Sequence, residues 1–344
     1  GATVVIYDKG VEIGRVVAEN GTWSFTPEQD LAEGEHSFTV QAIDTAGNVS
    51  EPSAAWELEI DITRPVPPEN PIDEIIDDQG SITGPIEQGG VTDDTTPTIK
   101  GKGEPGDTII ILDNGTKIGE VEVGEDGTWA FTPETELGDG DHGISVIIQD
   151  PAGNQSEPSD EWVFTVDTQA PDAPVIGSVL DDVGVKTGEL ASGDVTDDQR
   201  PTLSGSAEKG ATVVIYDNGV EIGRVVAEDG TWSFTPEQDL AEGEHSFTVQ
   251  AIDTAGNVSE PSAAWELEID ITRPVPPENP IDEIIDDQGG ITGPIEQGGV
   301  TDDSTPTIKG KGEPGDTIII LDNGTKIGEV EVGEDGTWAF TPET

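Results

Sequence analysis

The chain has no cysteine and no methionine, and its 14 basic residues face 73 acidic ones, which leaves a net charge of −59. Without cysteine no disulfide can stabilise a domain, so an extracellular module of this kind needs another source of stability, for which divalent cations are candidates. The negative charge excludes a nucleic-acid binder that works through phosphate contacts, and it argues against anionic membrane surfaces. No run of about 18 or more apolar residues occurs, so we expect no membrane insertion in this segment.

The sequence repeats itself at two levels. Residues 1–135 align with 210–344 and differ at only four positions: Lys9/Asn218, Asn20/Asp229, Ser81/Gly290 and Thr95/Ser304. Inside this long period two diverged units alternate, each of a size common for single domains. We expect four repeats: a C-terminal part at 1–61, complete repeats at 62–167 and 168–270, and an N-terminal part at 271–344. The simplest interpretation is an excerpt from a longer tandem array; the alternative is that the partial repeats complete each other between chains.

Short β-branched runs with alternating apolar residues predict strands rather than a disordered acidic tail. In the repeat at 168–270 the Asn-Gly pair 218–219 separates two such runs, which is a strong hairpin signal. The expected strands are 174–179, 201–207, 211–217, 220–228, 231–236, 245–253 and 264–270. This pattern predicts an all-β chain of tandem Ig-like, seven-stranded antiparallel β-sandwiches. The Cys…Trp…Cys signature of antibody domains is absent, so the likeness is one of architecture.

One tryptophan recurs in the phrase GTWSFTP or GTWAFTP, at Trp23, Trp129, Trp232 and Trp338. The phrase follows an Asp-Gly or Asn-Gly turn and ends at a proline, as expected of a short core strand. We therefore interpret the four indoles as core anchors. The alternative, a carbohydrate-stacking platform, is disfavoured because the phenylalanine two residues later shares the face of the indole.

Acidic residues gather in turns and at strand ends. The stretches 77–94 and 181–198 open and close with an Asp pair and hold several glycines, and further Asp residues lie in the DTAGN and DPAGN loops and at the last strands. Hard oxygen ligands on Gly-rich loops suit Ca²⁺, whereas Mg²⁺ demands a tighter octahedron and Zn²⁺ prefers Cys and His. The candidate Ca²⁺ ligands are Asp44, Asp61, Asp77, Asp78, Asp93, Asp94, Asp150, Asp167, Asp181, Asp182, Asp197, Asp198, Asp253, Asp270, Asp286, Asp287, Asp302 and Asp303. The alternative is that these residues serve only turns and solubility.

Several phrases occur together in a fixed order: TDD..PT..G, GATVVIYDNG, DGTW.FTP, L.EGEH.FTV and A.D.AGN.S.PS. With these phrases the whole chain resembles the bacterial Ig-like repeats of giant adhesins, which include biofilm-associated and non-fimbrial adhesins exported by type I secretion. The resemblance implies a protein that is secreted or held at the bacterial cell surface. It also implies an extended rod of Ca²⁺-stiffened β-sandwiches, with neighbouring repeats as partners, that holds an adhesive tip away from the cell.

The same resemblance implies a cation at the junctions between repeats. Carried over to this chain, Asp167 is joined by Asp150 from the DPAGN loop and by Asp181 and Asp182 of the next repeat. The Asp pair at 197–198 serves either that site or a second one within its repeat. The connector at 61–71 is richer in proline than the family pattern, and proline favours extended segments, which also predicts a rod.

An enzyme is not expected. The three histidines, His36, His142 and His245, are one recurring position directly before a strand, and no Ser or Cys nucleophile arrangement accompanies them. Carboxylate pairs suit glycoside hydrolysis, but no pair stands out among so many acids. We expect a structural extender. The alternatives are a subunit of an extracellular matrix or surface filament, in which copies of the chain associate, and a glycan-binding module.

Overall fold

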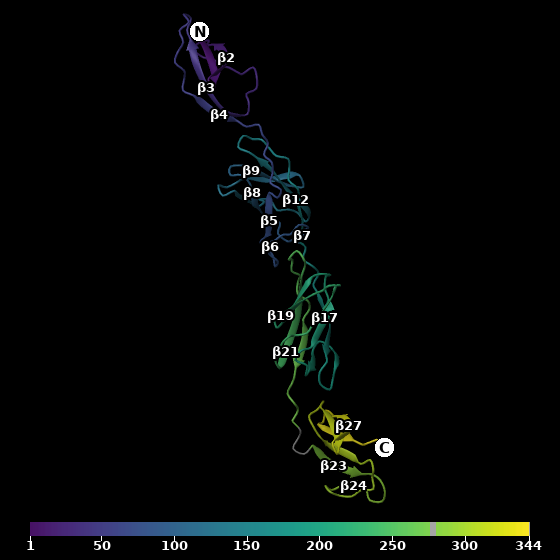
Figure 1. Cartoon of the computed structure of the whole chain (residues 1–344). Helices are drawn as coiled ribbons and strands as arrows, with labels where there is room; N and C mark the ends of the chain where they lie inside the picture. The colour runs from purple at the N-terminus through teal and green to yellow at the C-terminus, as the bar shows by residue number, and fades with distance from the viewer. Residues whose placement is uncertain (276–279, 344) are drawn as a thin grey trace. The chain divides into compact units, whose positions relative to one another are not determined.

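The β-branched runs form strands throughout the chain, as Figure 1 shows for a computed structural model that describes residues 1–275 and 280–343. No helix occurs among these residues, and so none that could span a membrane. The chain divides into two compact units, Gly1–Asp270 and Ile271–Thr344. Residues 276–279 and Thr344, which belong to the repeat predicted at 271–344, lie outside the described residues.

The complete repeat at 168–270 is a two-sheet β-sandwich. Its strands are β14 (Val175–Asp181), β15 (Gly188–Leu190), β16 (Asp194–Thr196), β17 (Thr202–Ser206), β18 (Thr212–Asp217), β19 (Val220–Val226), β20 (Thr231–Phe234), β21 (Gly243–Ile252) and β22 (Trp265–Ile269). One sheet has the order β15-β14-β17-β20 and the other β16-β22-β21-β18-β19. Leu203 of the first sheet and Phe247 of the second are fully buried in the shared core. The predicted Ig-like sandwich is confirmed.

The repeat at 62–167 has the same architecture although its sequence has diverged. Its strands are β5 (Ile72–Asp77), β6 (Gly84–Pro85), β7 (Gly90–Thr92), β8 (Thr98–Lys102), β9 (Thr108–Asp113), β10 (Thr116–Glu122), β11 (Thr128–Phe131), β12 (Gly140–Gln149) and β13 (Trp162–Val166). The sheets have the orders β11-β8-β5-β6 and β10-β9-β12-β13-β7. In each complete repeat, apolar side chains from both sheets pack together into one core.

The remaining strands belong to the two partial repeats. They are β1 (Thr3–Asp8), β2 (Val11–Val17), β3 (Gly34–Ile43), β4 (Trp56–Ile60), β23 (Ile281–Asp286), β24 (Gly293–Pro294), β25 (Thr307–Lys311), β26 (Thr317–Asp322), β27 (Thr325–Glu331) and β28 (Thr337–Phe340). The first four form one sheet, β2-β1-β3-β4. In the second unit, β24-β23-β25-β28 form a sheet and β26-β27 form a hairpin.

Two strands in each complete repeat were not expected. In the repeat at 168–270 they are β15 and β16, which lie inside the acidic stretch 181–198. β16 runs parallel to β22, with Thr196 beside Ile269, so one pairing departs from the antiparallel expectation. Three residues are too few to show a period in sequence. The pairing satisfies backbone groups along the last strand that would otherwise face solvent or stay unpaired.

The Asn-Gly hairpin forms as predicted. Asn218 and Gly219 have φ of +49° and +78°, the positive values that a type I′ turn needs at both central positions. In the first copy Lys9 stands at the same turn position with φ +49°, a conformation that asparagine tolerates better than lysine does.

Three of the four predicted tryptophan anchors are buried. Trp129, Trp232 and Trp338 are only 3–5% exposed, so they are core residues and cannot stack on a carbohydrate. Trp23 is 44% exposed, and the prediction of burial is wrong for this residue. The reason is that residues 1–61 contribute a single sheet, and among the described residues no second sheet packs on it.

Candidate metal centre

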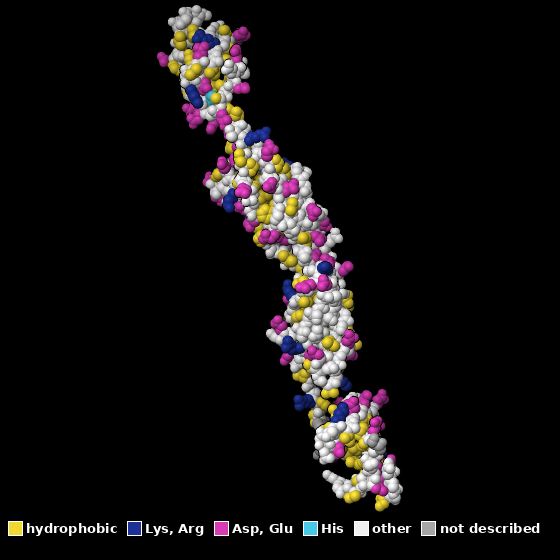
Figure 2. Space-filling view, turned by 45° about the vertical axis from the view of Figure 1, so that its right-hand side comes forward, with side chains coloured by type: hydrophobic (Ala, Val, Ile, Leu, Met, Phe, Trp, Pro, Cys, Tyr) yellow, Lys and Arg dark blue, Asp and Glu magenta, His cyan; other side chains and the backbone are white. Residues whose placement is uncertain are grey.

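Most acidic side chains are spread over the visible surface of the repeats (Figure 2), but a smaller set is buried. The buried ones include Asp77 and Asp94, Asp181 and Asp198, and Asp286 and Asp303. Each pair opens and closes one of the glycine-rich acidic stretches. A buried carboxylate is costly unless it accepts hydrogen bonds or binds a cation, so its partners decide its role.

A threonine between the two Asp positions supplies most of these partners. Thr92 Oγ1 donates to Asp77 Oδ2 at 2.5 Å and accepts from the backbone N–H of Asp94 at 3.1 Å. Asp94 in turn accepts two backbone N–H groups, at 3.3 and 2.8 Å. The same network recurs around Thr196 and Thr301 in the following repeats. These buried Asp residues therefore hold their own loops together. Sequence reasoning missed this threonine, although it stands in every copy of VTDD.

The second acidic loop is also closed by its own aspartate. Asp253 Oδ1 accepts the backbone N–H groups of residues 255–257 at 2.8–2.9 Å, and Asn257 Nδ2 donates to its Oδ2 at 2.9 Å. In the first copy the hydrogen bonds from Asn48 lower the pKa of the Asp44 carboxyl. The loop thus presents a rigid, negatively charged turn.

Within the unit Gly1–Asp270, this loop meets the acidic stretch of the preceding repeat. The backbone N–H of Asp93 donates to Ala255 O at 3.1 Å, and Asn257 Nδ2 donates to Asp167 O at 2.8 Å. The junction between the two complete repeats therefore brings together Asp93, the end of the last strand at Asp167, and the loop headed by Asp253.

Asp93 carries the clearest sign of a missing partner. Its Oδ1 is buried and has no hydrogen-bond partner. Burial raises the pKa of Asp93, and the charges of Asp77, Asp253 and Asp94 raise it further. Negative charge thus converges on an unpaired carboxylate oxygen, which is the chemistry that a hard, oxygen-binding cation would satisfy.

The grouping of Asp150, Asp181 and Asp182 with Asp167 is wrong. The loop of Asp150 lies at the start of its own repeat, where Asn154 Nδ2 donates to Asp61 O at 3.1 Å. Asp181 accepts a hydrogen bond from Thr196, and the Thr196 carbonyl accepts from the Asp270 N–H at 2.9 Å. Asp181 and the adjacent Asp182 therefore belong to the end of the repeat at Asp270. Asp167 has the equivalent contact with Thr92, at 2.9 Å, so its acidic neighbours come from its own repeat and from the Asp253 loop.

Asp197 and Asp302 are the equivalents of Asp93 in the acidic stretches of the following repeats. Asp197 and Asp302 lie against Gly184 and Gly289, as Asp93 lies against Gly80. Asp78, Asp182 and Asp287 are exposed. In residues 1–275 and 280–343 no group of three or more His, Cys, Asp or Glu side chains is arranged to hold a metal ion. A cation at Asp93 would therefore require neighbouring carboxylates to turn toward it.

The recurring histidine has a structural role. His245 Nδ1 lies 2.8 Å from Asp217 Oδ2, and its Nε2 lies 2.8 Å from Ala241 O. Both ring nitrogens therefore have a partner inside the repeat, which fixes the orientation of the ring. The ring is buried and stacks on Phe247. His36 and His142 make the same contacts in their repeats.

These features define tandem Ig-like β-sandwich modules joined through acidic loops. The chain belongs to the family described as Bacterial Ig-like domain, whose model matches residues 1–62, 69–168, 175–271 and 279–344. Modules of this class are typically non-catalytic.

Individual relatives are more distant. The chain is 27% identical over 248 residues to Exoglucanase B of Cellulomonas fimi, and the match covers 72% of this chain but only 21% of that protein. Among solved structures, a tetra-tandem repeat in the extending region of a large adhesion protein is 18% identical, covers 99% of this chain and 82% of its own, and has a TM-score of 0.24. Fibronectin(III)-like modules of Clostridium thermocellum CbhA are 16% identical over 56% of this chain and 92% of theirs, with a TM-score of 0.34.

Proposed function

We propose that this chain is a run of structural extender repeats from a bacterial surface adhesin, secreted or held at the cell surface, and that Ca²⁺ stiffens its junctions. The observation that carries the proposal is the junction at Asp93, where a buried, unpaired carboxylate oxygen faces the acidic loop of the next repeat. Membership of a tandem Ig-like family and the adhesin-like phrases of the sequence support the extender role.

The residues at this junction fit Ca²⁺ better than other common cations. Asp93, Asp77, Asp94 and Asp253 offer only oxygen donors, and no Cys exists in the chain. Ca²⁺ accepts six to eight oxygens in flexible geometry, whereas Zn²⁺ favours sulfur and nitrogen. Burial and the neighbouring carboxylates both raise the pKa of Asp93, and a bound Ca²⁺ would offset both effects and tie the two repeats to each other.

The connector after Asp167 supports a stiff junction independently of any cation. Thr168 donates to Asp139 Oδ1 through both its backbone N–H and its Oγ1, at 3.0 and 2.8 Å. These contacts, together with a hydrogen bond from Gln169, lower the pKa of Asp139. A connector tied back to its own repeat has few free dihedral angles, which favours a rod over a flexible coil.

Calcium titration of the whole chain tests the proposal, with Asp93→Asn as the variant. The matched control is Asp229→Asn, because the first copy naturally has Asn20 at that exposed position. We expect calorimetry to detect one Ca²⁺ fewer for Asp93→Asn and an unchanged number for the control. A concentration of Ca²⁺ 100 times its Kd stabilises a site by about 2.7 kcal/mol, so chelation should lower the melting temperature of wild type more than that of Asp93→Asn.

Two results would contradict parts of the proposal separately. An unchanged number of bound Ca²⁺ in Asp93→Asn would remove the cation from this junction. The second result would come from small-angle scattering. If the maximum dimension of the chain is the same with Ca²⁺ and with chelator, the cation does not stiffen the array. The extender role would then stand without Ca²⁺, and the connectors alone would have to stiffen the junctions.

A second candidate is a spacer within a modular secreted enzyme, which the match to a segment of Exoglucanase B favours. In that case the repeats would separate catalytic and binding modules rather than a cell surface and an adhesive tip. The parent sequence on either side of this segment distinguishes the two, since a catalytic module there would favour the enzyme.

A further inference from the structure

Asp107 is a buried carboxylate that lies outside the acidic stretches. It directly precedes β9 and is only 6% exposed. Its backbone groups are bonded, because its N–H donates to Glu104 O at 3.1 Å and its carbonyl accepts from Val123 N at 2.8 Å. Its side chain makes no hydrogen bond or ion pair with any described residue. A buried carboxylate without such partners is costly, so Asp107 needs a ligand or a proton.

The register of the strands places Asp107 opposite Asp150. Thr108 and Gln149 are the last paired positions of β9 and β12, so the two acids follow them at the same end of the sandwich. Ile109, two residues after Asp107, is fully buried in the core, and positions two apart along a strand share a face. Directly opposed residues of an antiparallel pair have Cβ atoms about 5 Å apart. The two carboxyl groups therefore lie close together at the end of the core.

The surroundings of Asp107 are acidic. Burial raises the pKa of its carboxyl, and the charges of Glu104 and Asp150 raise it further. Asp150 itself is held in its ionised form, because the hydrogen bonds from Asn154 outweigh the effect of burial and lower its pKa. Negative charge therefore gathers at a carboxylate that has no partner of its own.

The two repeat types differ at this position. Ala211 is the equivalent of Asp107 in the repeat at 168–270 and is only 1% exposed, and Ala2 stands there in the first partial repeat. Asp316 keeps the acid in the last partial repeat. Since alanine fills the same buried place in the same fold, the fold does not require an acid there.

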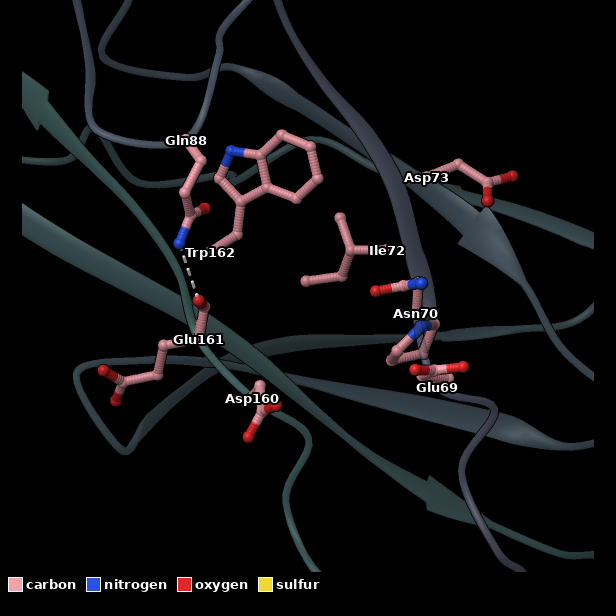
Figure 3. Close-up of a pocket in the computed structure, with 9 residues that line it drawn as sticks. Glu69, Asn70, Ile72, Asp73, Gln88, Asp160, Glu161 and Trp162 are labelled. Atoms are coloured by element: carbon pink, nitrogen blue, oxygen red, sulfur yellow. Dashed lines mark hydrogen bonds between the residues drawn. The ribbon is translucent and has the colours of Figure 1, made fainter.

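Burial also separates Asp107 from other acids of its repeat. Asp160 and Glu161, which are labelled in Figure 3, are exposed, and so is Glu69 near the start of β5. Water satisfies an exposed carboxylate, so these three give no sign of a ligand.

Burial and charge together select the ligand of Asp107. So little of its carboxylate is exposed that a small ion fits better than a saccharide or a peptide side chain. Ca²⁺ binds clustered carboxylates and completes its six to eight oxygens with backbone carbonyls and water. No three acidic side chains in residues 1–275 and 280–343 are already arranged to hold a metal ion, so the exposed Glu104 would turn inward when the ion binds.

We propose that repeats of the 62–167 type bind Ca²⁺ at Asp107, and that repeats of the 168–270 type have no such site. Asp150 and Glu104 supply the other carboxylates. The site shares its cation with the proposed function but uses none of the residues around Asp93, so either site can exist without the other.

The ion would act where the chain enters the repeat. Asn154 Nδ2 donates both to Asp150 Oδ2, at 2.9 Å, and to Asp61 O, at 3.1 Å. A cation shared by Asp107 and Asp150 would therefore tie the start of β9 to the loop that holds the connector. This end of the repeat would be stiffened by a cation in one repeat type only.

Calorimetric titration of the whole chain with CaCl₂ counts the bound ions. Asp93→Asn is the background, so that the junction cation does not contribute. We expect Asp107→Ala to bind one Ca²⁺ fewer than this background, and the fold tolerates alanine there, as Ala211 shows. The matched control is Asp316→Ala. Residues 271–344 contain no AGN loop, so Asp316 has no equivalent of Asp150 in this chain and the number of ions should not change.

Hydrogen exchange separates a metal ligand from a residue that only supports the fold. It is read in β12 and β13, whose sequences occur once in the chain. In the Asp93→Asn background, Ca²⁺ at 100 times its Kd should slow exchange through unfolding of this repeat about 100-fold, and Asp107→Ala should abolish that slowing. In chelator Asp107→Ala should instead slow exchange, because it removes an unpaired buried acid.

Three results would overturn the proposal. An unchanged number of ions in Asp107→Ala would mean that a proton, and not a metal, satisfies the buried carboxyl. Loss of an ion in Asp316→Ala as well would mean that the pairing with Asp150 is not what binds it. Faster exchange of Asp107→Ala in chelator would mean that the acid supports the fold. The junction proposal is judged separately, by comparison of Asp93→Asn with wild type.

Discussion

The buried threonine of the acidic stretch allows a quantitative test of what stabilises each repeat. The hydroxyl of Thr196 donates to Asp181 Oδ2 at 2.6 Å and accepts from Asp198 N at 3.0 Å. In Thr196→Val a methyl group replaces this hydroxyl, and both hydrogen bonds are lost. A hydrogen bond to a charged group contributes about 1.5–3 kcal/mol, and a buried group left unsatisfied costs about 1–3 kcal/mol. Because Asp181 is only 4% exposed, we expect Thr196→Val to lower the unfolding free energy of its repeat by about 3 kcal/mol.

Native-state hydrogen exchange of the whole chain measures this free energy locally. It should be read in β14 and β17, whose sequences occur only once in the chain. The experiment is done in chelator, so that loss of the hydroxyl is not confused with loss of a cation. Thr196→Ser should recover most of the protection, and Thr235→Val, an exposed threonine, should change it by less than about 0.5 kcal/mol. A change for Thr196→Val as small as that of the control would refute the role of this network.

Three further predictions follow from local geometry. Gly223→Ala should destabilise its repeat by about 1–3 kcal/mol in thermal unfolding, because the new Cβ would lie 2.3 Å from Phe234 Cε2. Asn218→Lys should cost about 1–2 kcal/mol in the same assay, since φ is +49° there; no change would show that this turn does not discriminate. Hydrogen bonds to a backbone carbonyl and to Asp8 raise the pKa of His36 above its usual 6.5, which NMR titration should detect and Asp8→Asn should reverse. The charged ring then contributes stability at low pH that is lost as pH rises through the raised pKa; an unshifted titration would contradict this.

The fold was predictable because its signals are local. The Asn-Gly pair at 218–219 has only one common hairpin conformation, and the alternation around Trp232 places the indole in a core. β15 and β16 were not predictable, because a three-residue strand has no period and forms only where a longer strand offers its edge.

The candidate site was predictable in its components and not in its arrangement. The acidic stretches and the AGN loops stand out in sequence as recurring clusters. Which end of the sandwich each loop occupies depends on long-range pairing, so Asp150 was assigned to the wrong junction. The contact between Asp93 and Ala255 joins positions separated by more than a whole repeat, and no local pattern encodes it.

The alternation of two repeat types divides the sequence into shared and diverged positions with different physical roles. The threonine of VTDD, the asparagine of AGN and the tryptophan of the GTW phrase stand in both types, and these residues form the loops, the junction and the core. The exposed residues Asp160 and Glu161 of one type stand where the other type has Ala263 and Ala264. Adjacent domains of near-identical sequence can exchange strands during folding. In this chain the two adjacent complete repeats have different core residues. Divergence between neighbours therefore lowers the risk of strand exchange and leaves the surface of each type free to acquire its own binding chemistry.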